Sequence, residues 1–481
     1  MKAIIYPAGL GLQIINKPRW QNHKMEEWRR FLLAYRIGSR ARICVIVLDH
    51  TSKWLIIPLF ITTWLRKLLT TRLHFSGRAT QSMFTRITGG ALNQSQNDLD
   101  WLVEMKTPRF DYKQRGENIV QIVGVMHGES GLARNTPMSA EAFGLANIPI
   151  DLSLGQFDRT GAKVVAASVR KLRQSITLHH INADRIPPQI LSAGPSMHIG
   201  YLLWELKQVP SSHLLAGKLL DEVWVPSTYV QNIYKNIYGC KAVNIRKGLS
   251  LPEVVATDLA EYGINADHQV FLMCFDAHSS VEWKNPLAAV HAFVAAFPND
   301  QNVRLLIKTT PVSPAHWGDP NKQMQKIKAI ARFDSRVIVD ERMLSFTKLL
   351  SLIKRADCIV SPHRAEGFGY IPAYALWYGR LVISTNYSGT RDICDGNTAY
   401  PIPYKLIDIG AGESITLMKN AEWADIDVQA LSLTLRAIND DPMSAKIKAL
   451  CGQKLLGSEY TIEMQAKRCL NRFRELGPIA E

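Results

Sequence analysis

Several patterns that assign proteins to common classes are missing from this chain of 481 residues. Its seven cysteines are scattered, with no C-x-x-C pair, which argues against a disulfide framework or a zinc site and favours a reducing cytoplasm. Residues 1–42 lack the apolar core of a signal peptide, so we expect no secretory signal. No nucleic-acid-binding motif is present either. Apolar residues make up 47% of the chain, which is ample for buried cores.

The chain is basic, and its charge is uneven. The net charge is +15, and residues 1–84 contain fourteen lysines and arginines against three acidic residues, an excess of eleven. In this region the apolar run 54–65 has tryptophan near both ends and basic flanks, as at membrane interfaces, but it is too short to span a bilayer. We therefore expect residues 1–116 to form a basic extension in which residues 43–67 touch an anionic membrane. A core helix or a docking face is the alternative.

From residue 117 onward, apolar runs of strand length alternate with helical patterns, which predicts an α/β protein with parallel sheets. We expect a first Rossmann-like domain at residues 117–262 and a second at 263–456. The last segment, 457–481, is expected to be a helix that packs back at the domain junction. Gly128 and Gly131 mark the first turn, but their spacing does not match a dinucleotide-binding motif.

Three local patterns give specific expectations. His179 and His180 are neighbours in one predicted strand, so only one of them is expected to face inward. Residues 276–283 are expected to form a loop before a helix. Residues 421–440 are expected to form one continuous helix.

The most informative stretch is a predicted strand, a glycine-rich turn and a helix around Glu366-Gly367-Phe368-Gly369. A glycine-rich turn before a helix offers free N–H groups and the positive end of the helix dipole to an anion, typically a phosphate. His363 and Arg364 add donors, and Glu366 adds an acceptor for hydroxyls. Phosphate donors together with a hydroxyl acceptor fit a nucleotide-sugar. The alternative is a plain structural turn.

This stretch resembles the donor-binding motif of retaining glycosyltransferases of family 4, the "glycosyl transferases group 1". The residues that follow the order of that motif are Ser361, Glu366 to Gly369, Gly379 and Val382 to Thr385. Bacterial polysaccharide-type members also share H-R-x-E-G-F-G and a later N-Y-S-G-x-x-D, here at residues 363–369 and 386–392. Three more blocks, H-I-N-A-D, W-E-L and D-E-V-W-V-P-S, follow the same subgroup in order. The resemblance covers residues 118–476 and implies the GT-B fold, with two Rossmann-like domains facing each other across a cleft.

The resemblance also implies an activity. It is the transfer of a hexose from a nucleotide-sugar donor, with retention of configuration, to a glycan or lipid-linked oligosaccharide in surface polysaccharide synthesis. The basic extension would place this reaction at the inner face of the cytoplasmic membrane. We expect no cofactor, because the nucleotide-sugar is a substrate. We also expect no metal, because a lysine and a helix N-terminus can neutralise the departing diphosphate.

The matching positions carry the roles that the family assigns. Lys284 would hold the diphosphate and Glu366 the sugar hydroxyls. The residues that would bind other parts of the donor are Arg364, Gly367, Phe368, Gly369, Arg342, Leu344, Tyr374, Gly128 and Gly131. His127 and Glu205 are candidates for a proton acceptor by position alone.

Two positions depart from the family pattern. Tyr374 stands where the family has a second glutamate for the ribose, and Ser279 stands near the place of an arginine that pairs with the lysine. These departures keep a second interpretation open, a catalytically degenerate scaffold or partner subunit of an active transferase. A nucleotide-sugar epimerase on the same fold is a third interpretation, against which the H-R-x-E-G-F-G block argues.

Overall fold

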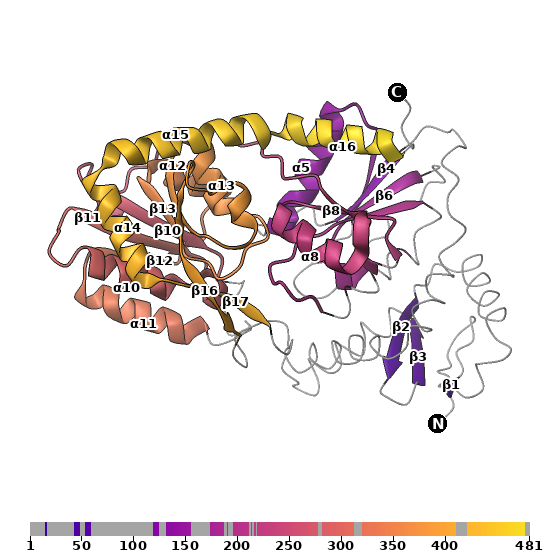
Figure 1. The fold of residues 1–481 in the computed structure, drawn as a ribbon, viewed down its shortest axis with the longest axis horizontal. Helices are drawn as coiled ribbons and strands as arrows, with labels where there is room; N and C mark the ends of the chain where they lie inside the picture. Colours follow the sequence, from indigo (N-terminus) through magenta and orange to yellow (C-terminus); the bar gives the residue numbers. More distant parts are fainter. Residues whose placement is uncertain are drawn as a thin grey trace.

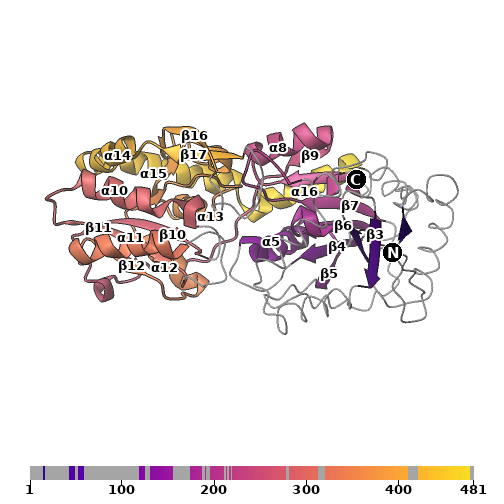
Figure 2. The ribbon, with the colours of Figure 1, turned by 90° about the horizontal axis from the view of Figure 1, so that it is seen from below.

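The computed structural model shows an α/β protein with two parallel sheets. It describes residues 15–16, 43–48, 53–58, 119–124, 131–154, 174–186, 190, 196–210, 213, 216–217, 219–277, 281–311, 320–409 and 421–476. Figures 1 and 2 show the two sheets in separate lobes that lie side by side, with the last two helices running along both.

Three short strands lie in the expected extension. They are β1 (Ile15–Asn16), β2 (Ile43–Leu48) and β3 (Lys53–Pro58), which pair antiparallel in the order β1-β3-β2. The candidate membrane segment 43–67 therefore contains two strands, and its residues 59–67 lie outside the described residues. Among the residues that the structure describes, no helix combines the length and apolar character needed to cross a membrane.

The first large sheet is entirely parallel, in the order β5-β4-β6-β7-β8-β9. Its elements are β4 (Ile119–Gly124), α5 (Gly131–Leu145), β5 (Ile150–Leu154), β6 (Gln174–His180), β7 (Met197–Tyr201), β8 (Glu222–Val225), α8 (Thr228–Tyr238) and β9 (Ala242–Asn244). Short 3₁₀ helices lie after β6, α8 and β9: η2 (Ala183–Arg185), η3 (Gly239–Lys241) and η4 (Ala260–Tyr262). His179 and His180 are both fully buried, so the expectation that only one faces inward is wrong. The reason is that a parallel sheet is covered on both faces.

The second large sheet is also parallel, in the order β12-β11-β10-β13-β14-β15. Its strands are β10 (Gln269–Phe275), β11 (Val303–Thr309), β12 (Val337–Asp340), β13 (Cys358–Ser361), β14 (Leu381–Thr385) and β15 (Tyr400–Ile402). Its other elements are α9 (Val281–Lys284), α10 (Pro286–Ala296), α11 (Pro320–Phe333), α12 (Phe346–Arg355), α13 (Tyr370–Trp377), η5 (Ser388–Asp392) and α14 (Val428–Asp440). A separate antiparallel hairpin joins β16 (Tyr404–Asp408) to β17 (Glu422–Ile426).

Two local expectations are wrong. Residues 281–284 form the short helix α9 instead of loop; it ends because Asn285 adopts a left-handed backbone (φ 55°) before Pro286 opens α10. Residues 421–440 are a strand followed by a helix, because β17 finds a partner in β16 and Asp427 then caps α14 by accepting a hydrogen bond from the Ala430 N–H.

Helices α15 (Pro442–Glu459) and α16 (Ile462–Leu476) cross from the second lobe to the first. On α16, the ring of Phe473 lies 5.6 Å from that of Phe143 on α5, and Arg472 forms an ion pair of 2.5 Å with the buried Glu222 of β8. The end of the chain thus completes the core of the lobe that it left more than 200 residues earlier.

Candidate active site

The glycine-rich turn of the second lobe lies where the two lobes meet. The Gly367 carbonyl accepts a hydrogen bond of 2.6 Å from the Ser227 hydroxyl, which comes from the first lobe and also caps α8. The Gly389 N–H donates to the Glu366 carbonyl at 2.8 Å, and a Cβ atom on Gly389 would lie 2.1 Å from the Gly367 oxygen. Gly369 opens α13 with a φ of +89°, which favours glycine. The turn is therefore fixed from both lobes.

Three charged side chains meet beside this turn. The Lys284 Nζ lies 2.6 Å from Glu366 Oε1, and both side chains are 17% exposed. Glu205, in the segment after β7 of the first lobe, interacts electrostatically with both of them. The structure thus brings together three of the four residues that the sequence proposed for catalysis.

The surroundings change the proton affinity of this cluster. Burial raises the pKa of Glu205 from 4.5 to about 7; Lys284 opposes this shift and Glu366 adds to it. Burial alone would lower the pKa of Lys284, but the carboxylates of Glu366 and Glu205 raise it above its ordinary range. Near neutral pH the cluster therefore holds a fixed cation and a carboxyl group that is ready to take or release a proton.

Arg364 is engaged elsewhere. Its guanidinium lies 4.8 Å from the ring of Trp423 and 3.2 Å from Asp425, and its backbone carbonyl accepts from the Ala424 N–H at 3.0 Å. It therefore anchors the β16–β17 hairpin to the glycine-rich turn. His363 is buried as well, with its Nε2 3.1 Å from the Thr390 hydroxyl.

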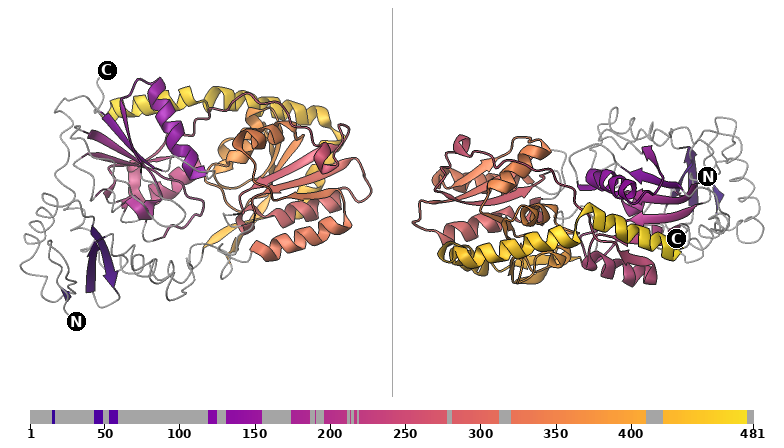
Figure 3. Two further views of the ribbon diagram at one scale, coloured as in Figure 1. Left: turned by 180° about the vertical axis from the view of Figure 1, so that it is seen from behind. Right: turned by 90° about the horizontal axis from the view of Figure 1, so that it is seen from above.

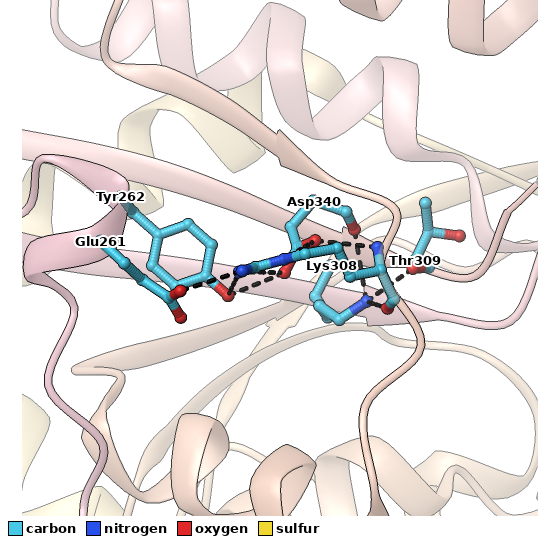
Figure 4. A network of polar contacts seen from close by, with 6 residues as sticks. Glu261, Tyr262, Lys308, Thr309 and Asp340 are labelled. Atoms are coloured by element: carbon cyan, nitrogen blue, oxygen red, sulfur yellow. Dashed lines mark hydrogen bonds and ion pairs between the residues drawn. The ribbon is translucent and has the colours of Figure 1, made fainter.

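Arg342 takes part in a network of polar contacts at the carboxyl ends of β11 and β12. Figure 4 shows this network and labels Glu261, Lys308 and Asp340 among its members. Its guanidinium pairs with Asp340 and with Glu261, both at 2.9 Å. The Lys308 ammonium donates to the Thr309 carbonyl at 2.7 Å and to the carbonyl of Arg342 itself. The network ties η4, in the segment between the lobes, to the loop after β12. In that loop, Leu344 packs half-buried against the main core.

Tyr374 is buried in a cluster of aromatic rings. Its ring centroid lies 5.6 Å from those of both Phe346 and Tyr370, and its hydroxyl has no hydrogen-bond partner among the described residues. From the first lobe, the Arg134 guanidinium lies 3.4 Å from the Phe346 ring. The position of the family's ribose-binding glutamate is thus filled by packed rings.

Of the remaining expected site residues, the structure describes some and leaves others outside the described residues. Phe368 is buried against Tyr460, and Gly131 is the first residue of α5. His127 and Gly128 lie outside the described residues.

Sequence reasoning missed an aromatic cluster beside the charged site. Trp283, next to Lys284, packs at 6.5 Å and a near-right angle against Trp423, and Tyr387 contacts Tyr229 across the lobes. It also missed the role of Asp392, which accepts a 2.7 Å hydrogen bond from the Thr228 N–H at the start of α8. The signal for Asp392 was its place at the end of the N-Y-S-G-x-x-D block. Among the described residues, no group of three or more His, Cys, Asp or Glu side chains is placed to hold a metal ion.

Comparisons with known proteins agree with this architecture. A family model described as Glycosyl transferases group 1 matches residues 281–419. Among solved structures, sucrose-phosphate synthase from Thermosynechococcus elongatus has a TM-score of 0.55 at 14% identity, covering 75% of this chain and 99% of that one. A glycosyltransferase from Rickettsia africae has a TM-score of 0.55 at 13% identity, covering 75% and 99%. None of the curated proteins matches this chain in sequence.

A third solved structure is the Anabaena protein HepE in complex with UDP and glucose. Its TM-score is 0.54 at 13% identity, and the match covers 74% of this chain and 99% of that one. At such low sequence identity, these structural similarities support the fold alone. That fold is GT-B, as the resemblance implied. The family match lies in the second lobe, around Lys284 and the glycine-rich turn. Residues 281–419 therefore match the glycosyl transferases group 1 model, and the chain is a glycosyltransferase of the GT-B fold.

Proposed function

We propose that this protein transfers a hexose from a nucleotide-sugar to a glycan or lipid-linked oligosaccharide, with retention of configuration, in surface polysaccharide synthesis at the cytoplasmic face of the membrane. The observation that carries the proposal is the cluster of Lys284, Glu366 and Glu205, which both lobes supply beside the start of α13. HepE is solved with UDP and glucose, and a UDP-sugar is therefore the first donor to test.

In the proposed reaction, each residue of the cluster has a distinct task. Lys284 turns from Glu366 to the donor diphosphate, which the N–H groups of the glycine-rich turn also hold. Glu366 is then free to accept hydrogen bonds from sugar hydroxyls. The bond from the anomeric carbon to the phosphate oxygen breaks, and the acceptor oxygen bonds to the same face of that carbon. The acceptor proton passes to the departing phosphate or to Glu205.

Donor binding tests the proposal directly. We expect one member of a panel of UDP-, GDP- and dTDP-sugars to raise the melting temperature of the wild type. A ligand at 100 times its Kd adds about 2.7 kcal/mol of stability. Glu366→Ala should weaken this shift, whereas Glu463→Ala, an exposed glutamate on α16, should preserve it. Transfer of radiolabelled sugar to an extracted acceptor then tests the activity itself.

The second candidate function is a non-catalytic scaffold. The packed Tyr374 ring and the engaged guanidinium groups of Arg364 and Arg342 favour it, because three expected donor contacts are occupied by protein groups. A flat response of the wild type across the whole panel would support the scaffold and reject the transferase.

A further inference from the structure

In helix α15 the residues that pack on the second lobe are mostly small, and three large apolar side chains are exposed on the opposite face. Ala445, Ala449 and Gly452 are buried, and a Cβ atom on Gly452 would lie only 2.5 Å from Leu376 Cδ2 on α13. The inner face therefore packs very closely on the second lobe. Leu456, near the end of the helix, is buried in the same core, whereas Met443, Ile447 and Leu450 lie outside this contact.

Met443, Ile447 and Leu450 are 67%, 57% and 53% exposed. They are spaced four and three residues apart, so they form one stripe along the outer face of α15. Isoleucine, leucine and methionine are normally buried, and apolar side chains gathered on a surface indicate an interaction site. In the right-hand view of Figure 3, α15 and α16 lie in front along one side of the molecule.

The charged residues on this outer face are basic. Lys446 and Lys454 are both exposed, and no acidic residue occurs from position 442 to 458. A third lysine, Lys448, instead donates to the Gly396 carbonyl of the protein body. An apolar stripe flanked by lysines is typical of helices that lie in the plane of an anionic membrane.

We propose that the outer face of α15 docks on an anionic lipid bilayer, with the three apolar side chains below the headgroups and Lys446 and Lys454 among them. A lipid surface fits better than a protein partner, since a standard protein interface uses roughly 20–30 residues on each side. The exposed residues of the adjoining α16 are polar, among them Glu463, Lys467 and Arg474. The proposal does not depend on donor chemistry, because an inactive scaffold with the same helix would bind lipid equally well.

The test uses the full chain with a fluorescent reporter on the helix itself. Cys451 follows Leu450 and is the exposed one among the free cysteines that the structure describes. In a Cys44→Ser, Cys240→Ser background, a nitrobenzoxadiazole label on Cys451 is checked by peptide mapping. We expect its emission to shift to the blue with vesicles of phosphatidylglycerol and phosphatidylcholine, and to stay unchanged with phosphatidylcholine alone.

Variants separate this face from other membrane contacts. The triple variant Met443→Gln, Ile447→Gln, Leu450→Gln should lower vesicle partitioning at least tenfold. Lys446→Gln and Lys454→Gln should each lower it about fivefold, since a lysine near an anionic surface contributes about 1 kcal/mol. The matched control Val255→Gln, Phe333→Gln changes apolar side chains that are 85% and 93% exposed elsewhere, and should bind as the wild type does.

Three results would overturn the proposal. In the first, the chain sediments with vesicles while the Cys451 label keeps its aqueous emission, so the contact lies elsewhere. In the second, the triple variant and its control partition equally. In the third, the label shifts with protein concentration in the absence of lipid and the mass is that of a dimer, which makes a second copy the occupant. The labelled Cys44→Ser, Cys240→Ser protein, in which the apolar stripe is unchanged, decides the matter even if the triple variant fails to fold.

Discussion

At the scale of single residues, Glu205 links the proposed reaction to pH. Its pKa is raised to about 7, so the carboxyl is mostly protonated below that pH and ionised above it. If the ionised form accepts the acceptor proton, kcat/KM should rise through pH 7 and then level off. Glu205→Gln should lower kcat and remove the rise. A wild-type profile that stays flat from pH 5.5 to 8.5 would exclude Glu205 as the proton acceptor.

Lys247 gives a prediction about stability. It is fully buried, its Nζ has no hydrogen-bond partner among the described residues, and the nitrogen lies 4.3 Å from the Tyr201 ring. Burial lowers its pKa from 10.5 to about 7. Between these values the unfolded chain binds a proton that the folded protein does not, so this residue makes stability rise with pH across that window.

We therefore expect Lys247→Met to stabilise the protein at pH 7 by roughly 1–4 kcal/mol, the range found when buried ionic groups are replaced by apolar ones. The gain should shrink towards pH 10, because the lysine of the unfolded chain then begins to lose its own proton and folding has less proton to remove. Urea unfolding at pH 7 and pH 9.5 measures both values. Lys467→Met, on the exposed face of α16, is the control. An equal gain at both pH values would show that ionisation is not the cause.

At the scale of elements, the contact between η5 and the glycine-rich turn gives a prediction with a nearby control. Gly389→Ala would place its Cβ 2.1 Å from the Gly367 oxygen, whereas a Cβ on Gly396 meets nothing within 4 Å. We expect Gly389→Ala to lower the free energy of unfolding by about 1–3 kcal/mol, as overpacking does, and to weaken donor binding by displacing the turn. Gly396→Ala should change neither quantity. Thermal unfolding with and without donor compares the two, and equal behaviour would contradict the tight contact.

At the scale of the whole molecule, α16 joins the end of the chain to the first lobe. Glu222 has a side chain that is 2% exposed, and burial raises its pKa while Arg472 opposes that rise. Arg472→Met would leave this carboxyl buried without its cation, so we expect the free energy of unfolding to fall by about 3 kcal/mol at pH 7. The loss should be smaller at pH 5, where the carboxyl can take up a proton.

Arg474→Met, two positions further along α16 and exposed, is the matched control and should have little effect. In Arg472→Met, the protection of backbone amides from hydrogen exchange should fall more in β8 and α5 than in the second lobe, because α16 packs on the first lobe. A loss confined to the second lobe would contradict the role of α16 as the closing element of the first.

The sequence by itself determined the features that depend on neighbouring residues. The run Gln269–Phe275 is a strand, as the alternation of strand-length apolar runs with helical patterns leads one to expect, because seven consecutive residues of mainly apolar character suit a strand buried on both faces. The glycine-rich turn and the start of α13 followed from glycine positions alone. The resemblance of residues 361–392 to a known motif was sufficient for the GT-B fold and for the transferase activity.

Only the tertiary structure decided which groups meet across the chain. Glu205 joins Lys284 and Glu366 because the two lobes face each other, and no local pattern records that approach. Likewise, residues 422–426 are a strand because β16 offers them a partner. Arg364 and Arg342 pair with carboxylates that only folding brings near, at Asp425 on β17 and at Glu261 on η4. Spacing in the sequence fixes the direction of a side chain along its own element, whereas its charge partner depends on how distant elements pack.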